Sequence, residues 1–180
     1  SYFRAISNRL YCITVINFQP PEPYLIDADV AKSMQEDIQT GDITAALLND
    51  DIENGYIIAK QEAVICGIPW VDACFKFLDP DIQLNWLVAE GQHVAANTVV
   101  LKFRGKARAL LSAERSALNF LQTLSATATQ TAQFAKRLAH SKTRVLDTRK
   151  TLPGLRLAQK YAVRVGGGVN HRMGLFDAVM

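Results

Sequence analysis

Residues 145–180 read VLDTRKTLPGLRLAQKYAVRVGGGVNHRMGLFDAVM, and the order of elements in this stretch sets the fold class. The segment 144–147 predicts a short strand, and the Pro-Gly pair at 153–154 predicts a tight turn before a helix over 155–165. A glycine loop follows, and the apolar run at 175–180 predicts another strand. A strand, a loop, a helix and a second strand in this order begin a parallel α/β series.

Two helices are expected in the first hundred residues. Ile26, Val30 and Met34 recur at four-residue spacing after a proline-rich stretch, which is typical of the buried face of a helix. The apolar residues of 68–79 also share one helical face, and Asp79-Pro80 ends that run.

The same region predicts a sheet. Asn54-Gly55 indicates a turn into a strand pair across 56–66. Apolar and polar residues alternate along 82–88 and again along 99–103, which predicts two half-buried strands. The first hundred residues therefore predict a mixed sheet with one or two helices on it, an α+β pattern.

Helical character dominates after Ala107. Residues 107–122 predict a helix with leucines along one side. A segment of small residues at 124–131 then leads into a second helix, which contains Phe134 and Leu138. The sequence therefore predicts two helices between the sheet and the parallel series.

Charge is distributed unevenly along this chain. Residues 1–100 carry 5 Lys/Arg and 14 Asp/Glu, whereas residues 141–180 carry 8 and 2. The basic second half suggests an anionic partner. Nucleic acid is the competing interpretation, but the cations are interleaved with glycines and apolar residues, and no nucleic-acid-binding motif accompanies them. A small anion is the favoured partner.

Cysteine, histidine and hydropathy patterns point to an ordinary globular protein of the cytoplasm. Cys12, Cys66 and Cys74 fit neither a closed disulfide set nor a metal motif, so buried reduced thiols are expected. The dispersed histidines argue against a histidine-based metal site. No apolar run reaches the roughly 18 residues of a membrane span. The apolar stretch at 10–18 lacks a cleavage site, which favours a folded segment over a signal peptide.

Cations gather where the strand at 144–147 ends. Thr148, Arg149 and Lys150 follow Asp147 directly, and an arginine fork beside a lysine point charge could hold a dianion from two directions. Asn170, His171 and Arg172 add further donors, and Arg156 follows the Pro-Gly turn. A solvated loop with surface cations is the alternative.

Two other features have equally plain structural interpretations. The triplet Gly166-Gly167-Gly168 permits backbone torsions that other residues avoid, and it serves either a helix cap or a ligand contact. Arg115 lies on an otherwise apolar, small-residue helix face and needs a counter-charge. A salt bridge or an arginine that reaches solvent would account for it.

Three stretches together resemble the quinolinate phosphoribosyltransferase family. They are DTRKTLPGLRLAQKYAVRVGGGVNHRMGLFDAV near the end, AERSALNFLQTLSATAT at 113–129 and GDIT at 41–44. The resemblance implies an enzyme of NAD biosynthesis. Such an enzyme joins quinolinate to phosphoribosyl pyrophosphate and releases pyrophosphate and carbon dioxide, giving nicotinate mononucleotide. It also implies a requirement for Mg²⁺.

The resemblance implies roles for six residues. Thr148, Arg149 and Lys150 match the family's substrate-binding Thr-Arg-Lys, and His171 and Arg172 match its Asn-His-Arg element at the quinolinate pocket. Arg115 matches an arginine that reaches into the site of a neighbouring subunit. A homodimer or a multiple of dimers is therefore expected, with no nucleic-acid or membrane partner.

The family fold is an α/β sandwich domain followed by an incomplete barrel of parallel α/β units. On this basis we expect an N-terminal extension at 1–21, the sandwich domain at 22–122 and the first part of the barrel at 123–180. The family pattern continues past Met180 with a lysine, and the metal-binding acidic residues and phosphate loops follow later. The catalytic residues and the Mg²⁺ ligands are therefore expected beyond Met180.

Two alternatives to this enzyme stay open at the level of the sequence. One is a related pyrophosphorylase that acts on another small acid, although such paralogues are expected to lose some of the cations that this chain keeps. The other is a binding protein without catalysis that ends at Met180.

Overall fold

A computed structural model of the chain describes residues 18–177. The expected extension at 1–21 and the apolar segment at 10–18 therefore lie largely outside the described residues, and Cys12 does so entirely. Of the run 175–180, which predicts a strand, residues 175–177 form a turn and the others are not described.

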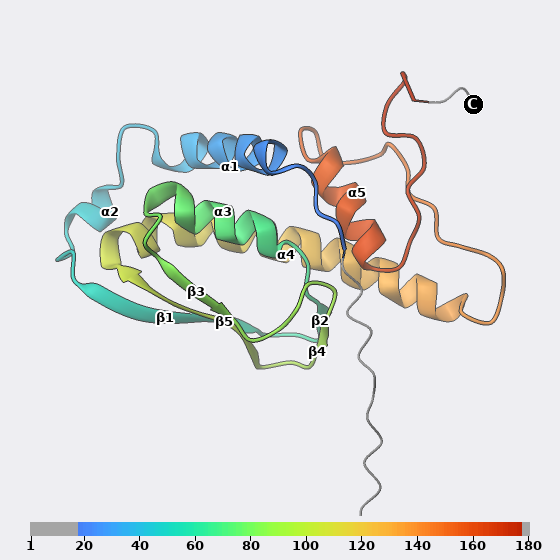
Figure 1. The fold of residues 1–180 in the computed structure, drawn as a ribbon, viewed down its shortest axis with the longest axis horizontal. Helices are drawn as coiled ribbons and strands as arrows, with labels where there is room; N and C mark the ends of the chain where they lie inside the picture. Colours follow the sequence, from blue (N-terminus) through green and yellow to red (C-terminus); the bar gives the residue numbers. More distant parts are fainter. Residues whose placement is uncertain (1–17, 178–180) are drawn as a thin grey trace, which may run out of the picture.

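Three antiparallel strands form the main sheet (Figure 1). β5 (Thr98–Lys106) lies between β1 (Ile52–Ala59) and β3 (Gln83–Trp86). β2 (Ala63–Val64) and β4 (His93–Val94) form a separate antiparallel pair. Each neighbouring pair in the sheet is antiparallel, so the sheet is antiparallel rather than mixed. β1 and β3 run in the same direction on either side of β5, and the connection between them crosses over through α3.

The Asn54-Gly55 pair does not form a turn, contrary to the prediction. Both residues lie inside β1, where Gly55 faces Phe103 of β5. A Cβ atom at Gly55 would lie 2.3 Å from the Phe103 ring. The glycine therefore makes room for a cross-strand aromatic side chain, and the expected pair across 56–66 does not form.

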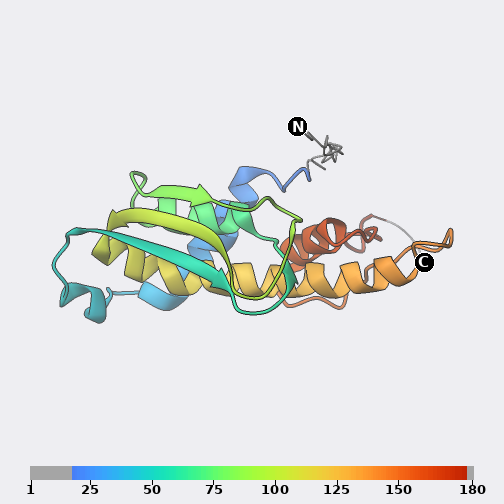
Figure 2. The ribbon, with the colours of Figure 1, turned by 90° about the horizontal axis from the view of Figure 1, so that it is seen from below.

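Helices cover one face of the sheet in two layers. α3 (Ile68–Leu78) and α4 (Ala107–Arg137) pack together against it, and α1 (Pro23–Ile38) lies on their outer side (Figures 1 and 2). α1 buries Ile26, Val30 and Met34, as predicted. α3 inserts Trp70 and Phe75 completely into the core. A short helix, α2 (Ile43–Ala46), links α1 to β1.

The two helices predicted after Ala107 are one helix. α4 runs unbroken through the small-residue segment and across residues 122 and 123, where the two expected domains meet. Ser125 Oγ accepts a hydrogen bond from the backbone N–H of Cys66 at 3.0 Å, and Thr129 Oγ1 accepts one from Val64 N–H at 2.8 Å. The small hydroxyl residues therefore mark where the backbone near β2 lies against α4, rather than a break in the helix.

The second half of α4 carries the beginning of the parallel series. α5 (Arg156–Val165) packs against it, and the remaining residues up to 177 form loops around α5 (Figure 2). The strand predicted at 144–147 is reduced to a single parallel bridge between Leu146 and Val169. The ladder stops there because Asn170 and His171 turn to bond the side chain of Asp147.

Candidate functional site

The bridge between Leu146 and Val169 brings the two predicted cationic segments together. Val169 N–H donates to Val145 O at 2.8 Å, and Asp147 N–H donates to Val169 O at 3.1 Å. The segment 148–150 therefore starts beside the segment 170–172. The convergence of their side chains on one anion stays a prediction.

The first segment, 148–150, is an exposed turn with one partly buried cation. The hydroxyl of Thr148 accepts a hydrogen bond from Lys150 N–H at 3.0 Å, and both side chains are exposed. Arg149 is half-buried, and its Nε is buried without a hydrogen-bond partner among the described residues. A buried guanidinium donor without an acceptor is costly, so Arg149 is suited to bind an anionic oxygen.

The second segment, 170–172, is fixed through its backbone. His171 N–H donates to Asp147 Oδ1 at 2.7 Å, while the His171 side chain is exposed. Arg172 follows and is half-buried. The arrangement leaves the imidazole of His171 accessible while its backbone is tied to the first segment.

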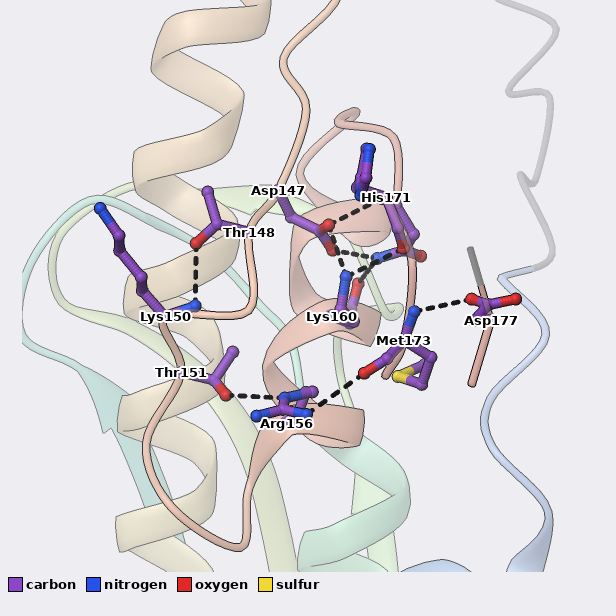
Figure 3. A network of polar contacts seen from close by, with 10 residues as sticks. Asp147, Thr148, Lys150, Thr151, Arg156, Lys160, His171, Met173 and Asp177 are labelled. Carbon is purple, nitrogen blue, oxygen red and sulfur yellow. Dashed lines mark hydrogen bonds and ion pairs between the residues drawn. The ribbon is translucent and has the colours of Figure 1, made fainter. Parts of the chain in front are cut away.

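A buried ion pair lies beneath both segments (Figure 3). Lys160 of α5 donates from Nζ to Asp147 Oδ1 at 2.6 Å and to the backbone oxygen of His171 at 3.0 Å. The side chains of Lys160 and Asp147 are 1% and 5% exposed. Asn170 Nδ2 donates to Asp147 Oδ2 at 2.6 Å and to Lys160 O at 2.9 Å, so both carboxylate oxygens of Asp147 are engaged.

Sequence reasoning missed Lys160. It lies among the buried face residues of α5, next to Ala158, Tyr161 and Ala162. A lysine in such a place needs a buried anion. Asp147 and Asp177 are the two acidic residues between 141 and 180. Asp147 follows the predicted strand directly, so this pairing could have been inferred.

The Pro-Gly turn orients α5 as predicted. Leu155 N–H donates to Leu152 O at 3.1 Å, and Gly154 adopts φ of +81°, which a type II turn requires at this position. Arg156 donates to Thr151 Oγ1 at 3.2 Å and to Met173 O at 3.3 Å (Figure 3). This cation therefore holds two loops together.

The glycine triplet forms a helix cap. Gly168 N–H donates to Val163 O and Gly167 N–H to Arg164 O, both at 2.9 Å, which is the Schellman pattern at the end of α5. Gly167 has φ of +85° and supplies the left-handed residue of that motif. Gly166 serves close packing, because a Cβ atom there would lie 2.4 Å from the backbone oxygen of Ala128 in α4.

Arg115 lies apart from these segments. It is exposed near the start of α4 and lines a cavity of about 480 Å³ with Asp42, Thr44 and Ser112. The loop after α5 touches α4 at Ala128. Thirteen residues of helix separate Arg115 from Ala128, about 20 Å at the helical rise. Arg115 therefore does not join the other five predicted residues within one chain.

The GDIT motif forms the opposite wall of that cavity. Asp42 accepts a hydrogen bond from Ala45 N–H at 2.9 Å, which caps α2, and another from the Ser112 hydroxyl at 2.7 Å. These donors, led by Ala45 N–H, hold the pKa of Asp42 below its usual value. Asp42 thus ties α2 to the turn of α4 that carries Arg115.

A second buried polar cluster joins α5 to the start of α3. Glu90 accepts hydrogen bonds from Gly67 N–H at 2.8 Å and Ile68 N–H at 3.0 Å, where α3 begins. Tyr161 of α5 contacts the side chain of Glu90, and its ring lies against that of Trp70 in a tilted arrangement with 5.5 Å between centroids. Burial raises the pKa of Glu90 and, together with the charge of Glu90, that of Tyr161.

The cysteines that the structure describes are free and buried, as predicted. Burial raises the pKa of Cys74 to about 12 and that of Cys66 further. Between residues 18 and 177, no three His, Cys, Asp or Glu side chains gather in a way that could hold a metal ion. Within the same range, no helix is both long and apolar enough to cross a membrane.

Two family models together match the chain from residue 42 onward. The N-terminal domain model of quinolinate phosphoribosyl transferase matches residues 42–125, and the C-terminal domain model matches residues 127–180. The chain is 44% identical over 161 residues to a probable nicotinate-nucleotide pyrophosphorylase (carboxylating) of Synechocystis, covering 89% of this chain and 55% of the relative. It is 39% identical to the chloroplastic enzyme of that name from Arabidopsis thaliana, and the match covers 92% of this chain and 48% of that enzyme.

Solved structures agree with the fold. A nicotinate-nucleotide pyrophosphorylase from Francisella tularensis superposes with a TM-score of 0.84 at 47% identity, covering 87% of this chain and 56% of that one. NadC from Streptococcus pyogenes superposes with a TM-score of 0.86 at 36% identity, covering 89% and 58%. The fold is therefore α/β with a partial barrel. The chain spans about half the length of the curated relatives it matches.

Proposed function

The chain belongs to the quinolinate phosphoribosyltransferase family, and we propose that the protein containing it converts quinolinate and phosphoribosyl pyrophosphate to nicotinate mononucleotide, pyrophosphate and carbon dioxide. The observation that carries the proposal is the convergence of the segments 148–150 and 170–172 at the bridge between Leu146 and Val169. Relatives with this activity in their names support it.

The binding step follows from charge. Quinolinate carries two carboxylates at neutral pH, and an unpaired buried anion costs several kcal/mol. Arg149, Lys150 and Arg172 supply the opposite charge, and Thr148 and His171 supply further polar groups. A bound carboxylate would offer an acceptor to the guanidinium of Arg149, whose Nε is buried without a partner among the described residues.

The chemical step needs no nucleophile from the protein. The ring nitrogen of quinolinate forms a bond to the anomeric carbon as pyrophosphate leaves with the bonding electrons. The resulting pyridinium stabilises the electron pair left when the adjacent carboxylate departs as carbon dioxide, and a proton then replaces it. The residues of this chain contribute by positioning the diacid and by electrostatic preorganisation.

A homodimer would complete the site. Arg115 is exposed on a different part of the chain from the other five residues, so it is available to a neighbouring subunit. We propose that Arg115 and the cavity it shares with the GDIT motif face the 148–150 and 170–172 segments of the partner subunit.

Magnesium remains a proposal for residues beyond Met180. Residues 18–177 contain no group of three His, Cys, Asp or Glu side chains that could hold a metal ion. We also propose the cytoplasm as the location. The chloroplastic enzyme of Arabidopsis makes an organelle the alternative, and a fluorescent fusion of the full-length protein would distinguish the two.

Titration of the full-length protein with quinolinate tests the proposed function. We expect Arg149→Ala to raise the Kd by about tenfold or more, about 1.4 kcal/mol. Arg144→Ala is the matched control, because Arg144 is an exposed arginine five residues earlier, and it should leave the Kd unchanged. Equal affinity in both variants would contradict the proposal. Turnover of nicotinate in preference to quinolinate would favour a paralogue with another substrate.

A further inference from the structure

We propose that Lys160 and Asp147 are positioning residues for quinolinate. Their buried ion pair fixes the segments 148–150 and 170–172 relative to each other and keeps the charge of Asp147 from opposing the bound anion. This inference rests on the proposed function, and it assigns a role to two residues that do not themselves need to touch the substrate.

The contacts of the pair reach both segments. Asp147 directly precedes Thr148, and its Oδ1 also accepts a hydrogen bond from His171 N–H at 2.7 Å. Lys160 Nζ bonds both that carboxylate at 2.6 Å and His171 O at 3.0 Å. The pair therefore fixes the backbone of the residue that precedes Arg172. Without Lys160, the bridge between Leu146 and Val169 would still hold the bases of the two segments together, but the backbone oxygen of His171 would lose its link to Asp147.

The second argument is electrostatic. Asp147 directly precedes the segment 148–150, and its side chain is 5% exposed. Paired with Lys160, it contributes little net charge, so the neighbouring cations keep their attraction for a dianion. Without Lys160, a buried and uncompensated carboxylate would lie beside them, repel the substrate and attract Arg149.

A purely structural ion pair would behave differently. It would lower the free energy of unfolding when broken, while the molecules that stay folded would bind quinolinate as before. A positioning pair lowers the affinity of the folded protein itself. Affinity measured well below the melting temperature therefore separates the two roles.

The experiment uses the full-length protein and quinolinate titration, with KM for both substrates and kcat measured in parallel. We expect Lys160→Met to raise the Kd and KM of quinolinate by about tenfold or more, because truncating one partner of a buried charge pair is costly. The KM of phosphoribosyl pyrophosphate should change much less. Lys142→Met, the same replacement at an exposed lysine, is the control.

The double variant Asp147→Asn/Lys160→Met separates charge from position. It removes the uncompensated carboxylate but does not restore the bonds of Lys160 Nζ to both segments. We expect it to bind more tightly than Lys160→Met and still several-fold more weakly than wild type. Full recovery of wild-type affinity would overturn the positioning role.

A second variant that is expected to destabilise the fold less provides a test if Lys160→Met does not fold. Asn170→Ser removes the amide that bonds Asp147 Oδ2 and Lys160 O, and Asn170 is only half-buried. We expect a higher Kd for quinolinate in this variant than in wild type. An unchanged Kd would count against the inference even if Lys160→Met does not fold. If wild type itself fails to bind quinolinate, the proposed function falls. If wild type binds and Lys160→Met binds equally well, this inference alone falls.

Discussion

Glu90 shows how a single buried carboxyl makes stability depend on pH. Two backbone donors at the start of α3 hold it in a largely apolar environment. Burial raises its pKa above the ordinary value of 4.5, and the hydrogen bonds from Gly67 and Ile68 only partly oppose that shift. Above pH 4.5 the unfolded chain releases this proton while the folded chain retains it to a higher pH. The free energy of unfolding therefore falls as pH rises through that window.

Glu90→Gln removes this titration. We expect the stability of the variant, relative to wild type, to increase as pH rises from about 4.5 toward neutrality. Urea unfolding of the full-length protein at a series of pH values measures the difference. A stability difference that is the same at every pH would contradict this assignment.

Some residues of the candidate site could be identified from the sequence, and others were missed. Thr148, Arg149 and Lys150 were recognisable because polar residues directly follow a predicted strand. Lys160 was missed because a lysine on a short helix normally reaches solvent, whereas here it is 1% exposed. The signal that could have identified it is the combination of a lysine among the buried residues of a helix and Asp147 directly after the predicted strand.

At the scale of elements, side-chain hydroxyls of α4 bond the backbone between β2 and α3. Ser125 Oγ both accepts from Cys66 N–H at 3.0 Å and donates to Cys66 O at 3.1 Å. Alanine at this position would leave two backbone groups without their partner in a buried place. The contact therefore fixes the backbone that follows β2 against α4.

We expect Ser125→Ala to lower the free energy of unfolding by about 1–3 kcal/mol. Thr127→Ala is the comparison, because its hydroxyl bonds only Thr123 O within the same helix, and it should be nearly neutral. Chemical denaturation of the full-length protein gives both values. Similar losses for the two variants would argue against a special role for the Ser125 contact.

Elements with a clear amphipathic period were predictable, and those shaped by close contacts were not. α1 and α3 followed from their apolar spacing because each buries one face. The break expected inside α4 was wrong, since small residues there admit a neighbouring backbone. Asn54-Gly55 was misassigned because its glycine serves Phe103 in another strand, a contact invisible to local sequence. The parallel segment 144–147 was located correctly, although it forms only one bridge.

At the scale of the whole molecule, α4 separates two groups of predicted site residues. Arg115 lies near its start, and the 148–150 and 170–172 segments lie around α5 beside its second half (Figure 1). Under the proposed dimer, each chain contributes one of these groups to each site. An antiparallel association of two chains would complete two sites.

Mixing two variants that are each impaired in quinolinate binding, and assaying them at low quinolinate concentration, tests this arrangement. Arg115→Ala and Arg149→Ala damage different parts, so a mixed dimer keeps one intact site. Random mixing makes half of the dimers mixed, and we expect about a quarter of wild-type activity to return. Assays of the full-length proteins before and after subunit exchange measure the recovery. Activity that stays at the level of the separate variants would contradict a shared site.

Lys160 and Tyr161 are sequence neighbours with different destinations. Lys160 bonds Asp147 beneath the segments 148–150 and 170–172, whereas Tyr161 contacts Glu90 and Trp70 near the start of α3. Each added helical residue rotates the following side chains by about 100°. Inserting or deleting one residue in α5 ahead of Lys160 would therefore misdirect both anchors together.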